Sequence, residues 1–244
     1  GFEIEQKALK DLIRKTSYAV SKDETRYVLT GILIQFQSDK VSLIATDGRR
    51  LALAEVKGSF GEGTQDIVLP YKAVLEISKV LGDEGVVEMI PFENQVAFVL
   101  KNQSVSDQCV VISRLLDGSF PNYRQVIPEK VKERVVLERE EFLSAVRRVS
   151  VVASEKTSLI KMSFTKNLLT LSAQATDVGE AKEEIPVAYE GEDTSIAFNP
   201  SFLSDALRSI EETEITFEFN DSLSPGVIRS GSTFLYVIMP MRIA

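Results

Sequence analysis

Residues 5–20, EQKALKDLIRKTSYAV, have a counterpart later in the chain in residues 138–153, EREEFLSAVRRVSVVA. Both stretches place apolar residues three and four positions apart, which predicts a helix with one buried face. On 5–20, Lys7, Lys10 and Arg14 fall on the opposite face. The two stretches align as Leu9 with Phe142, Ile13 with Val146, Arg14 with Arg147, Lys15 with Arg148, Ser17 with Ser150 and Ser21 with Ser154.

A second pair of helices repeats in the same order. Residues 71–81 follow Pro70, a favoured residue at a helix start, and residues 200–210 begin with Pro200. The aligned positions are Ala73 with Phe202, Val74 with Leu203 and Leu81 with Ile210. The remaining periodic segments alternate as strands do, at 27–37, 40–46, 51–56, 66–69, 86–91, 95–101 and 107–114, then at 159–165, 168–174, 214–220, 226–230 and 233–239.

This long internal period predicts two tandem, duplicated units of an α+β protein. In each unit we expect two helices packed on antiparallel sheets. The polar stretch 128–133 is the expected linker, so the units are placed at 1–130 and 131–244. Ala-Thr-Asp at 175–177 echoes Ala45-Thr46-Asp47 of the first unit.

The last stretch, residues 236–243, is unusually apolar for a chain end. Both of its alternating faces are apolar, which predicts an internal strand. Pro240 cannot donate a backbone hydrogen bond, so we expect pairing to stop there. Met241 and Ile243 would then project from a fixed strand. They could complete the core, or they could form an adaptable apolar surface that receives another protein's side chains.

Composition sets the class of protein. The 244 residues are 44% hydrophobic and 26% charged, as in soluble globular proteins. No apolar run approaches the ~20 residues of a membrane span, and no secretory leader is visible, so we expect a cytoplasmic protein. The single cysteine, Cys109, is expected to be a buried small hydrophobe in a strand.

The charge is acidic overall but uneven. The net charge is −8, so any nucleic-acid role depends on where the basic residues lie. Counting Lys and Arg against Asp and Glu, helix 5–20 carries 4 − 2 = +2 and helix 71–81 carries 2 − 1 = +1, whereas helices 138–153 and 200–210 are neutral. These could be ordinary solvated helix faces, or one phosphate-contacting side of the protein.

Catalytic chemistry has little support. A carboxylate-based hydrolase would need groups such as Asp47 and Asp177 to pair or to hold a metal. The chain has no histidine, no nucleophile elbow and no glycine-rich phosphate loop. Asp47 is more simply a turn residue that bonds its own backbone. We therefore expect a protein that is not an enzyme and has no cofactor or metal.

Three motifs resemble one family. They are Thr-Asp-Gly-Arg-Arg-Leu-Ala at 46–52, Asp-Gly-Ser-Phe-Pro-Asn-Tyr at 117–123 and Val-Ile-Met-Pro-Met-Arg-Ile at 237–243. Together with the duplicated units, their order and spacing are similar to those of the bacterial DNA polymerase III beta subunit, the sliding clamp. A complete subunit has three such units, and this chain resembles the second and third.

The resemblance implies a DNA-clamp fold and a processivity factor. Two three-unit subunits would close into a ring around duplex DNA, with helices lining the hole and making sequence-independent phosphate contacts. The implied DNA-facing residues here are Lys7, Lys10, Arg14, Tyr27, Lys72, Arg139 and Arg147.

The resemblance also implies a hydrophobic groove between the family's second and third units. It would bind a short linear peptide motif of polymerases, the clamp loader and repair proteins, with Arg50 and Arg242 supplying polar orientation. Its implied residues are Leu29, Thr46, Gly48, Arg49, Arg50, Leu51, Pro121, Val126, Leu223, Val237, Ile238, Met239, Pro240, Met241 and Arg242.

Departures from the family pattern affect peptide preference. They are Gln125, Thr157 and the ending Ile243-Ala244. Because the family's first unit is not in this sequence, we expect the chain by itself to be a monomer that does not encircle DNA. An alternative function is a stand-alone peptide-binding adaptor.

Overall fold

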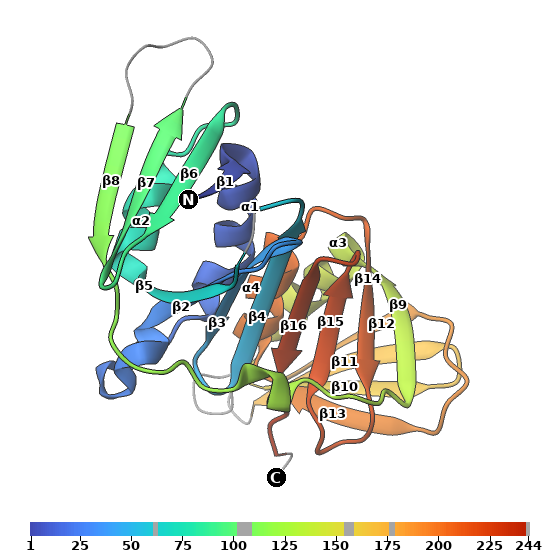
Figure 1. Ribbon diagram of the computed structural model, residues 1–244. Helices are drawn as coiled ribbons and strands as arrows, with labels where there is room; N and C mark the ends of the chain where they lie inside the picture. Colours follow the sequence, from blue (N-terminus) through green and yellow to red (C-terminus); the bar gives the residue numbers. More distant parts are fainter. Residues whose placement is uncertain (61–62, 102–108, 154–158, 176–178, 243–244) are drawn as a thin grey trace. The chain divides into compact units, whose positions relative to one another are not determined.

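The computed structural model describes residues 1–60, 63–101, 109–153, 159–175 and 179–242 (Figure 1). The chain divides into two compact units, Gly1–Tyr123 and Arg124–Ala244. This division lies closer to the N-terminus than the linker expected at 128–133. The units are described separately below.

The first unit contains two α-helices among its described residues. In chain order its elements are β1 (Phe2–Glu5), α1 (Gln6–Thr16), η1 (Ser17–Ala19), η2 (Glu24–Thr30), β2 (Gly31–Phe36), β3 (Lys40–Thr46), β4 (Arg50–Lys57), β5 (Gln65–Pro70), α2 (Tyr71–Val80), β6 (Val86–Pro91), β7 (Gln95–Lys101) and β8 (Cys109–Arg114). Its strands pair antiparallel in the orders β1-β6-β7-β8 and β5-β2-β3-β4.

Helix α1 lies on β3 and β4, and α2 lies on β2 and β5. The apolar stripe of α1 is buried, with Leu9 1%, Leu12 3% and Ile13 5% exposed. Val74 and Ile77 of α2 are buried in the same way. The helical period seen in the sequence therefore marks the residues that attach each helix to its sheet.

The second unit repeats this plan. Its elements are η3 (Tyr123–Val126), which starts at the last residue of the first unit, then β9 (Glu133–Glu138), α3 (Arg139–Ser150), β10 (Ile160–Thr165), β11 (Leu168–Ala175), β12 (Gly179–Pro186), β13 (Thr194–Phe198), α4 (Pro200–Ser209), β14 (Glu214–Phe219), β15 (Gly226–Ser230) and β16 (Phe234–Ile238). The antiparallel orders are β12-β11-β10-β13 and β16-β15-β14-β9. Helices α3 and α4 contact each other, and α3 also lies on β10, β11 and β12.

The predicted α+β class and the two pairs of helices are confirmed. Several strand predictions need correction. The strand expected at 27–37 begins only at Gly31, because Glu24–Thr30 forms 3₁₀ turns, which Asp23 caps by accepting the Thr25 amide hydrogen at 3.0 Å. The sequence analysis also missed β1, β9, β12 and β13. In β9 only Val135 and Leu137 face the interior, so the segment looked polar.

The expected burial of Cys109 is wrong. Cys109 is exposed, and it begins β8, which is the edge strand of its sheet. Val110 and Ile112 of the same strand are 51% and 64% exposed. The sequence analysis took this apolar run for an internal strand, but side chains on both faces of the strand are exposed.

The terminal strand predicted at 233–239 is present as β16 (Phe234–Ile238) and is buried on both faces. All five residues of β16 are buried, and the Tyr236 hydroxyl donates to the Phe202 carbonyl of α4 at 3.0 Å. The strand ends before Pro240, and the Met241 amide instead donates to the Ala197 carbonyl at 2.7 Å. Ile243, expected to project beyond it, lies outside the described residues. In the part of the chain that is described, no helix is long and apolar enough to span a bilayer.

An aromatic cluster fills the core of the second unit. The ring centroids of Phe164 and Phe219 are 4.4 Å apart, and those of Phe164 and Phe217 are 5.9 Å apart. Tyr189 joins at 5.7 Å from Phe164. Phe164 lies on β10 and the other two phenylalanines lie on β14, so the cluster joins the two sheets of the unit.

Replacing Phe164 with alanine should lower the free energy of unfolding by about 3–5 kcal/mol, because it removes a fully buried ring and leaves a cavity. Urea unfolding followed by circular dichroism measures this. Phe92→Ala, at a ring that is 54% exposed, is the matched control and should change stability by only about 0.5 kcal/mol. Equal losses in the two variants would contradict the assigned core.

Candidate functional site

The solvent-facing side of α1 carries the cations predicted to face DNA. Lys7 is exposed and makes no ion pair with any described residue. Lys10 is half-buried and donates to Asp83 Oδ1 at 3.0 Å, and Arg14 pairs with Asp11. The three side chains therefore share one helix, but only Lys7 makes no ion pair with a described residue.

Asp11 holds two cations at once, since Lys15 also lies 2.9 Å from its Oδ2. Burial by itself raises the pKa of Asp11, but hydrogen bonds from Arg14 and Lys15 and the charges of these two residues outweigh it and lower the pKa. The carboxylate therefore stays ionised at neutral pH. It neutralises part of the charge that the sequence assigns to this helix.

Tyr27 and Lys72 present open surface in the same unit. Tyr27 is 56% exposed on the 3₁₀ segment before β2. Lys72 is exposed in the first turn of α2, where it forms no ion pair within the described ranges. Helices α1 and α2 contact each other, so their cations belong to one helical layer of the unit.

In the second unit the two predicted arginines differ. Arg139 donates from Nε to the Glu212 carbonyl at 3.1 Å, reaches the Leu207 carbonyl at 3.5 Å and pairs with Glu140. It ties the start of α3 to the end of α4 and the turn after it, and only 20% of its side chain is exposed. Arg139 is thus engaged in a structural contact, whereas Arg147 is exposed.

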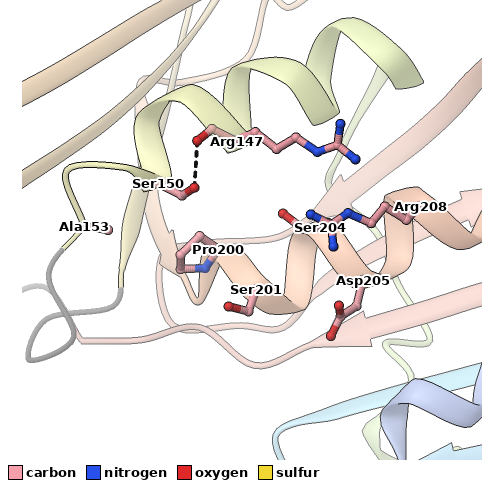
Figure 2. Close-up of a pocket in the computed structure, with 8 residues that line it drawn as sticks. All are labelled: Arg147, Ser150, Ala153, Pro200, Ser201, Ser204, Asp205 and Arg208. Carbon is pink, nitrogen blue, oxygen red and sulfur yellow. Dashed lines mark hydrogen bonds between the residues drawn. The ribbon is translucent and has the colours of Figure 1, made fainter.

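Arg147 lines a pocket of about 330 Å³ between α3 and α4 (Figure 2). The other lining residues are Ser150, Ala153, Pro200, Ser201, Ser204, Asp205 and Arg208. The sequence analysis missed Arg208 and Ser204. The sequence indicated only that α4 is the counterpart of α2 in the second unit. It did not indicate which residues of α4 face α3.

The Thr46–Leu51 turn is the predicted peptide-binding segment of the first unit. The Thr46 hydroxyl donates to the Arg50 carbonyl at 2.6 Å and accepts from the Gly48 amide at 3.1 Å. Asp47 Oδ1 accepts from the amides of Arg49 and Arg50 at 2.9 and 3.1 Å. Asp47 is therefore the turn residue that the sequence indicates.

Arg50 makes its described contacts within the first unit. It was assigned to orient a peptide, but it is 9% exposed and its Nε donates to Asp47 Oδ2 at 3.1 Å. Its Nη2 donates to the Tyr18 carbonyl at 2.7 Å, and its guanidinium lies 5.6 Å from the Tyr18 ring centroid. Arg50 fastens the turn to the segment after α1. Tyr18 was not among the predicted residues.

Gly48 meets the expectation that a Cβ would be obstructed. Its φ is +85°, and a Cβ there would lie 2.5 Å from Arg26 Nη1. This nitrogen donates to the Asp47 carbonyl at 2.9 Å, a hydrogen bond that a Cβ at this position would displace. The positive φ favours glycine at this position, and the absence of a Cβ leaves the arginine its hydrogen bond.

The other predicted peptide-binding residues fall into two groups. The exposed ones, able to touch a partner directly, are Arg49 and Pro121 in the first unit and Val126, Leu223, Met239 and Arg242 in the second. Leu29, Pro240 and Met241 are half-buried, and Thr46, Leu51, Val237 and Ile238 are buried. Leu223 at 77% exposure is the most open apolar side chain of the set.

No cluster of three or more His, Cys, Asp or Glu residues able to hold a metal occurs in the described portion of the chain. Asp47 is occupied in its turn. Asp177, the second carboxylate of the hydrolase alternative, lies outside the described residues, as does Thr157.

Two sequence families match consecutive parts of this duplicated α+β chain. Residues 3–122 match the DNA polymerase III beta subunit, central domain, and residues 124–242 match the DNA polymerase III beta subunit, C-terminal domain. The chain belongs to the DNA polymerase III beta subunit family.

Curated relatives agree. The chain is 35% identical to the beta sliding clamp of Chlamydia pneumoniae and 34% identical to that of Bacillus subtilis, in each case over 99% of this chain. These matches cover 65% and 64% of the relatives, so the chain spans about two-thirds of their length or slightly less.

Solved structures show the same fold. The DNA polymerase sliding clamp of Bacillus subtilis superimposes with a TM-score of 0.92 at 33% identity, over 100% of this chain and 64% of that one. The beta subunit of DNA polymerase III from Thermotoga maritima gives 0.91 at 35%, over 100% and 65%. The DNA-clamp fold predicted for this chain is confirmed.

Gly48→Ala should lower the free energy of unfolding of the first unit by about 1–2 kcal/mol, through the positive φ and the contact with Arg26. Gly63→Ala is the matched control, with φ +108° and nothing within 4 Å of its Cβ position. Denaturant unfolding compares the two. A cost at Gly48 no larger than that at Gly63 would show that the Arg26 contact does not constrain the turn.

Proposed function

We propose that this chain is the central and C-terminal part of a sliding clamp, a non-catalytic processivity factor that encircles duplex DNA as a full-length homodimeric ring. The observation that carries the proposal is the pair of family matches, in order and covering nearly the whole chain, on a fold that superimposes on clamp structures at a TM-score of 0.92. In such a ring, topology rather than affinity retains the DNA.

Exposed cations on the helices support the DNA-binding part of the proposal. Lys7, Lys72 and Arg147 are exposed, come from helices, and form no ion pair within the described residues. Lysine and arginine in such positions neutralise phosphates without reading bases. The acidic net charge of −8 then keeps the affinity of each contact low, as sliding requires.

Exposed apolar side chains support the peptide-binding part. Val126, Leu223 and Met239 are 44%, 77% and 40% exposed. A leucine or aromatic anchor of a partner would bury this surface, and Met239 can adapt its shape to different anchors. We propose that these three residues of the second unit bind the short peptide motif of polymerases, the clamp loader and repair proteins.

Met239→Ala should weaken binding of a labelled Gln-Leu-x-Leu-Phe peptide about tenfold, because it removes apolar contact area from the anchor's surroundings. Fluorescence polarisation on the chain described here measures the affinity. Val80→Ala, at an equally exposed side chain (43%) on α2, is the control and should leave it unchanged. If Met239→Ala binds the peptide as tightly as the parent protein and Val80→Ala do, the assigned surface is refuted.

Lys7→Gln should weaken binding to duplex DNA and reduce the magnitude of the salt slope by about 0.9, the value expected for one lost phosphate contact. Lys132→Gln is the control, since Lys132 is held by Glu192 at 3.1 Å and was not assigned to the DNA-facing set. Affinities are measured by fluorescence anisotropy at several salt concentrations. An unchanged slope for Lys7→Gln would remove that residue from the DNA-facing set.

The second candidate function, a stand-alone peptide-binding adaptor, is favoured by the same exposed apolar residues. The Lys7→Gln variant separates the two functions. If peptide binding persists and duplex affinity is insensitive to every helix cation, the adaptor function stands and the DNA-binding proposal fails.

A further inference from the structure

The chain leaves the first unit through residues 115–123, a stretch that we call the strap. It follows β8 and contains the motif at 117–123. The Leu116 amide donates to the Val68 carbonyl of β5 at 2.9 Å. The Leu116 side chain packs against Gly31, where a Cβ would lie 2.7 Å from Leu116 Cδ1. The start of the strap is therefore attached to a sheet of the first unit.

Tyr123 attaches the other end of the strap to the same sheet. It is the last residue of the first unit, is 9% exposed, and donates from its hydroxyl to Gln35 Oε1 of β2 at 2.6 Å. Gln35 Nε2 in turn donates to Asp66 Oδ2 of β5 at 2.8 Å. Because a carboxylate can only accept, Asp66 turns the amide NH₂ of Gln35 toward itself and leaves Oε1 facing the tyrosine. We call these three residues the first clasp.

Asn220, which follows β14, attaches the chain again where it enters the second unit. Its Nδ2 donates to the Lys130 carbonyl at 2.9 Å, and its Oδ1 accepts from the Lys132 amide at 2.7 Å. One amide side chain thus pairs with the backbone of two alternate residues, as a neighbouring strand would. Lys132 also pairs with Glu192 at 3.1 Å, but both side chains are more than half exposed, so this ion pair adds little. Asn220, Lys130 and Lys132 form the second clasp.

The two clasps mark the ends of the connecting chain, which consists of residues 124–129. Fully extended, the chain between Tyr123 and Lys130 would span at most about 25 Å. If Tyr123 were released, the next described backbone hydrogen bond back along the chain would be that of Leu116. The same limit, now counted from Leu116, would rise to about 50 Å. The Tyr123 attachment therefore decides how much chain is available to connect the units.

We propose that the first clasp is a releasable anchor that sets the length of the tether between the two units, with Tyr123 as its positioning residue. The first clasp consists only of residues of the first unit, and the second clasp only of residues of the second unit, so each opens independently of the other. Opening the first clasp lengthens the tether, while the second clasp keeps the entry to β9 in place. The inference concerns the connection of the units and does not depend on DNA or peptide binding.

Chymotrypsin cleavage after residue 123 of the folded chain reports the first clasp, because the protease must draw the aromatic ring out of its buried position. Tyr123→Phe keeps a cleavable aromatic residue but removes the hydroxyl, and cleavage there should become about three- to tenfold faster. Gln35→Leu removes the acceptor and should have a similar effect. Because the two residues share one hydrogen bond, the double variant should be cleaved little faster than either single variant. Rates are normalised to those of synthetic peptides that span residues 117–129.

Tyr236→Phe is the matched control for a lost hydroxyl. The Tyr236 hydroxyl donates to the Phe202 carbonyl at 3.0 Å in the second unit, so its removal should leave cleavage after residue 123 unchanged. Asn220→Ala opens the second clasp, and trypsin cleavage after Lys130 should become about fivefold faster while cleavage after residue 123 stays the same. Circular dichroism and denaturant unfolding establish that each variant is folded.

Unchanged cleavage after residue 123 in Tyr123→Phe would overturn the anchor, since burial of the ring alone would then hold the strap. Equal acceleration in Tyr123→Phe and Tyr236→Phe would also overturn it, because a general loss of stability would account for the cleavage. If Asn220→Ala accelerates cleavage after residue 123 as much as cleavage after Lys130, the clasps do not open independently and the first clasp does not set the tether length.

Discussion

Burial of one stripe of each helix against its own sheet is the constraint on which the rest of the structure depends. On α1, Leu9, Leu12 and Ile13 are almost fully buried. Once this stripe is fixed, the helix cannot rotate, and Lys7 must face solvent. The direction of the exposed side chains is therefore set by the buried ones. Any DNA contact that the exposed side chains make depends on how the helix packs.

The same constraint limits how much charge the helices can present. Asp11 shares α1 with the predicted cations and engages Arg14 and Lys15, and Asp83 engages Lys10. Hydrogen bonds from these cations lower the pKa of both carboxylates, so the pairs persist through neutral pH. Counting residues gave α1 and its flanks a charge of +2, but the geometry concentrates the open charge at Lys7. Such a weakly charged surface fits the proposed sliding function, since tight phosphate contacts would slow movement along DNA.

Sequence periodicity was sufficient for the helices and for most strands, because apolar spacing directly records which side chains are buried. It failed where burial is one-sided or absent. Strand β12, with exposed Glu180, Lys182 and Glu184, has few apolar residues to reveal its period. Cys109 was misplaced for the opposite reason, since an apolar run looks internal even when its strand lies at an edge. Neither case can be decided without knowing what covers the strand.

The site residues show a further limit. The motif at 46–52 forms a tight turn, but its composition did not reveal that Arg50 points inward to Asp47 and the Tyr18 carbonyl. Arg147 and Arg148 make the same point, because successive residues on a helix point about 100° apart. Arg148 pairs with Glu183 on β12, whereas Arg147 lines a pocket and makes no ion pair with a described residue. Adjacent identical residues thus acquire different roles from the element each one faces, and that element, 35 residues away in the case of Glu183, is fixed only by the fold.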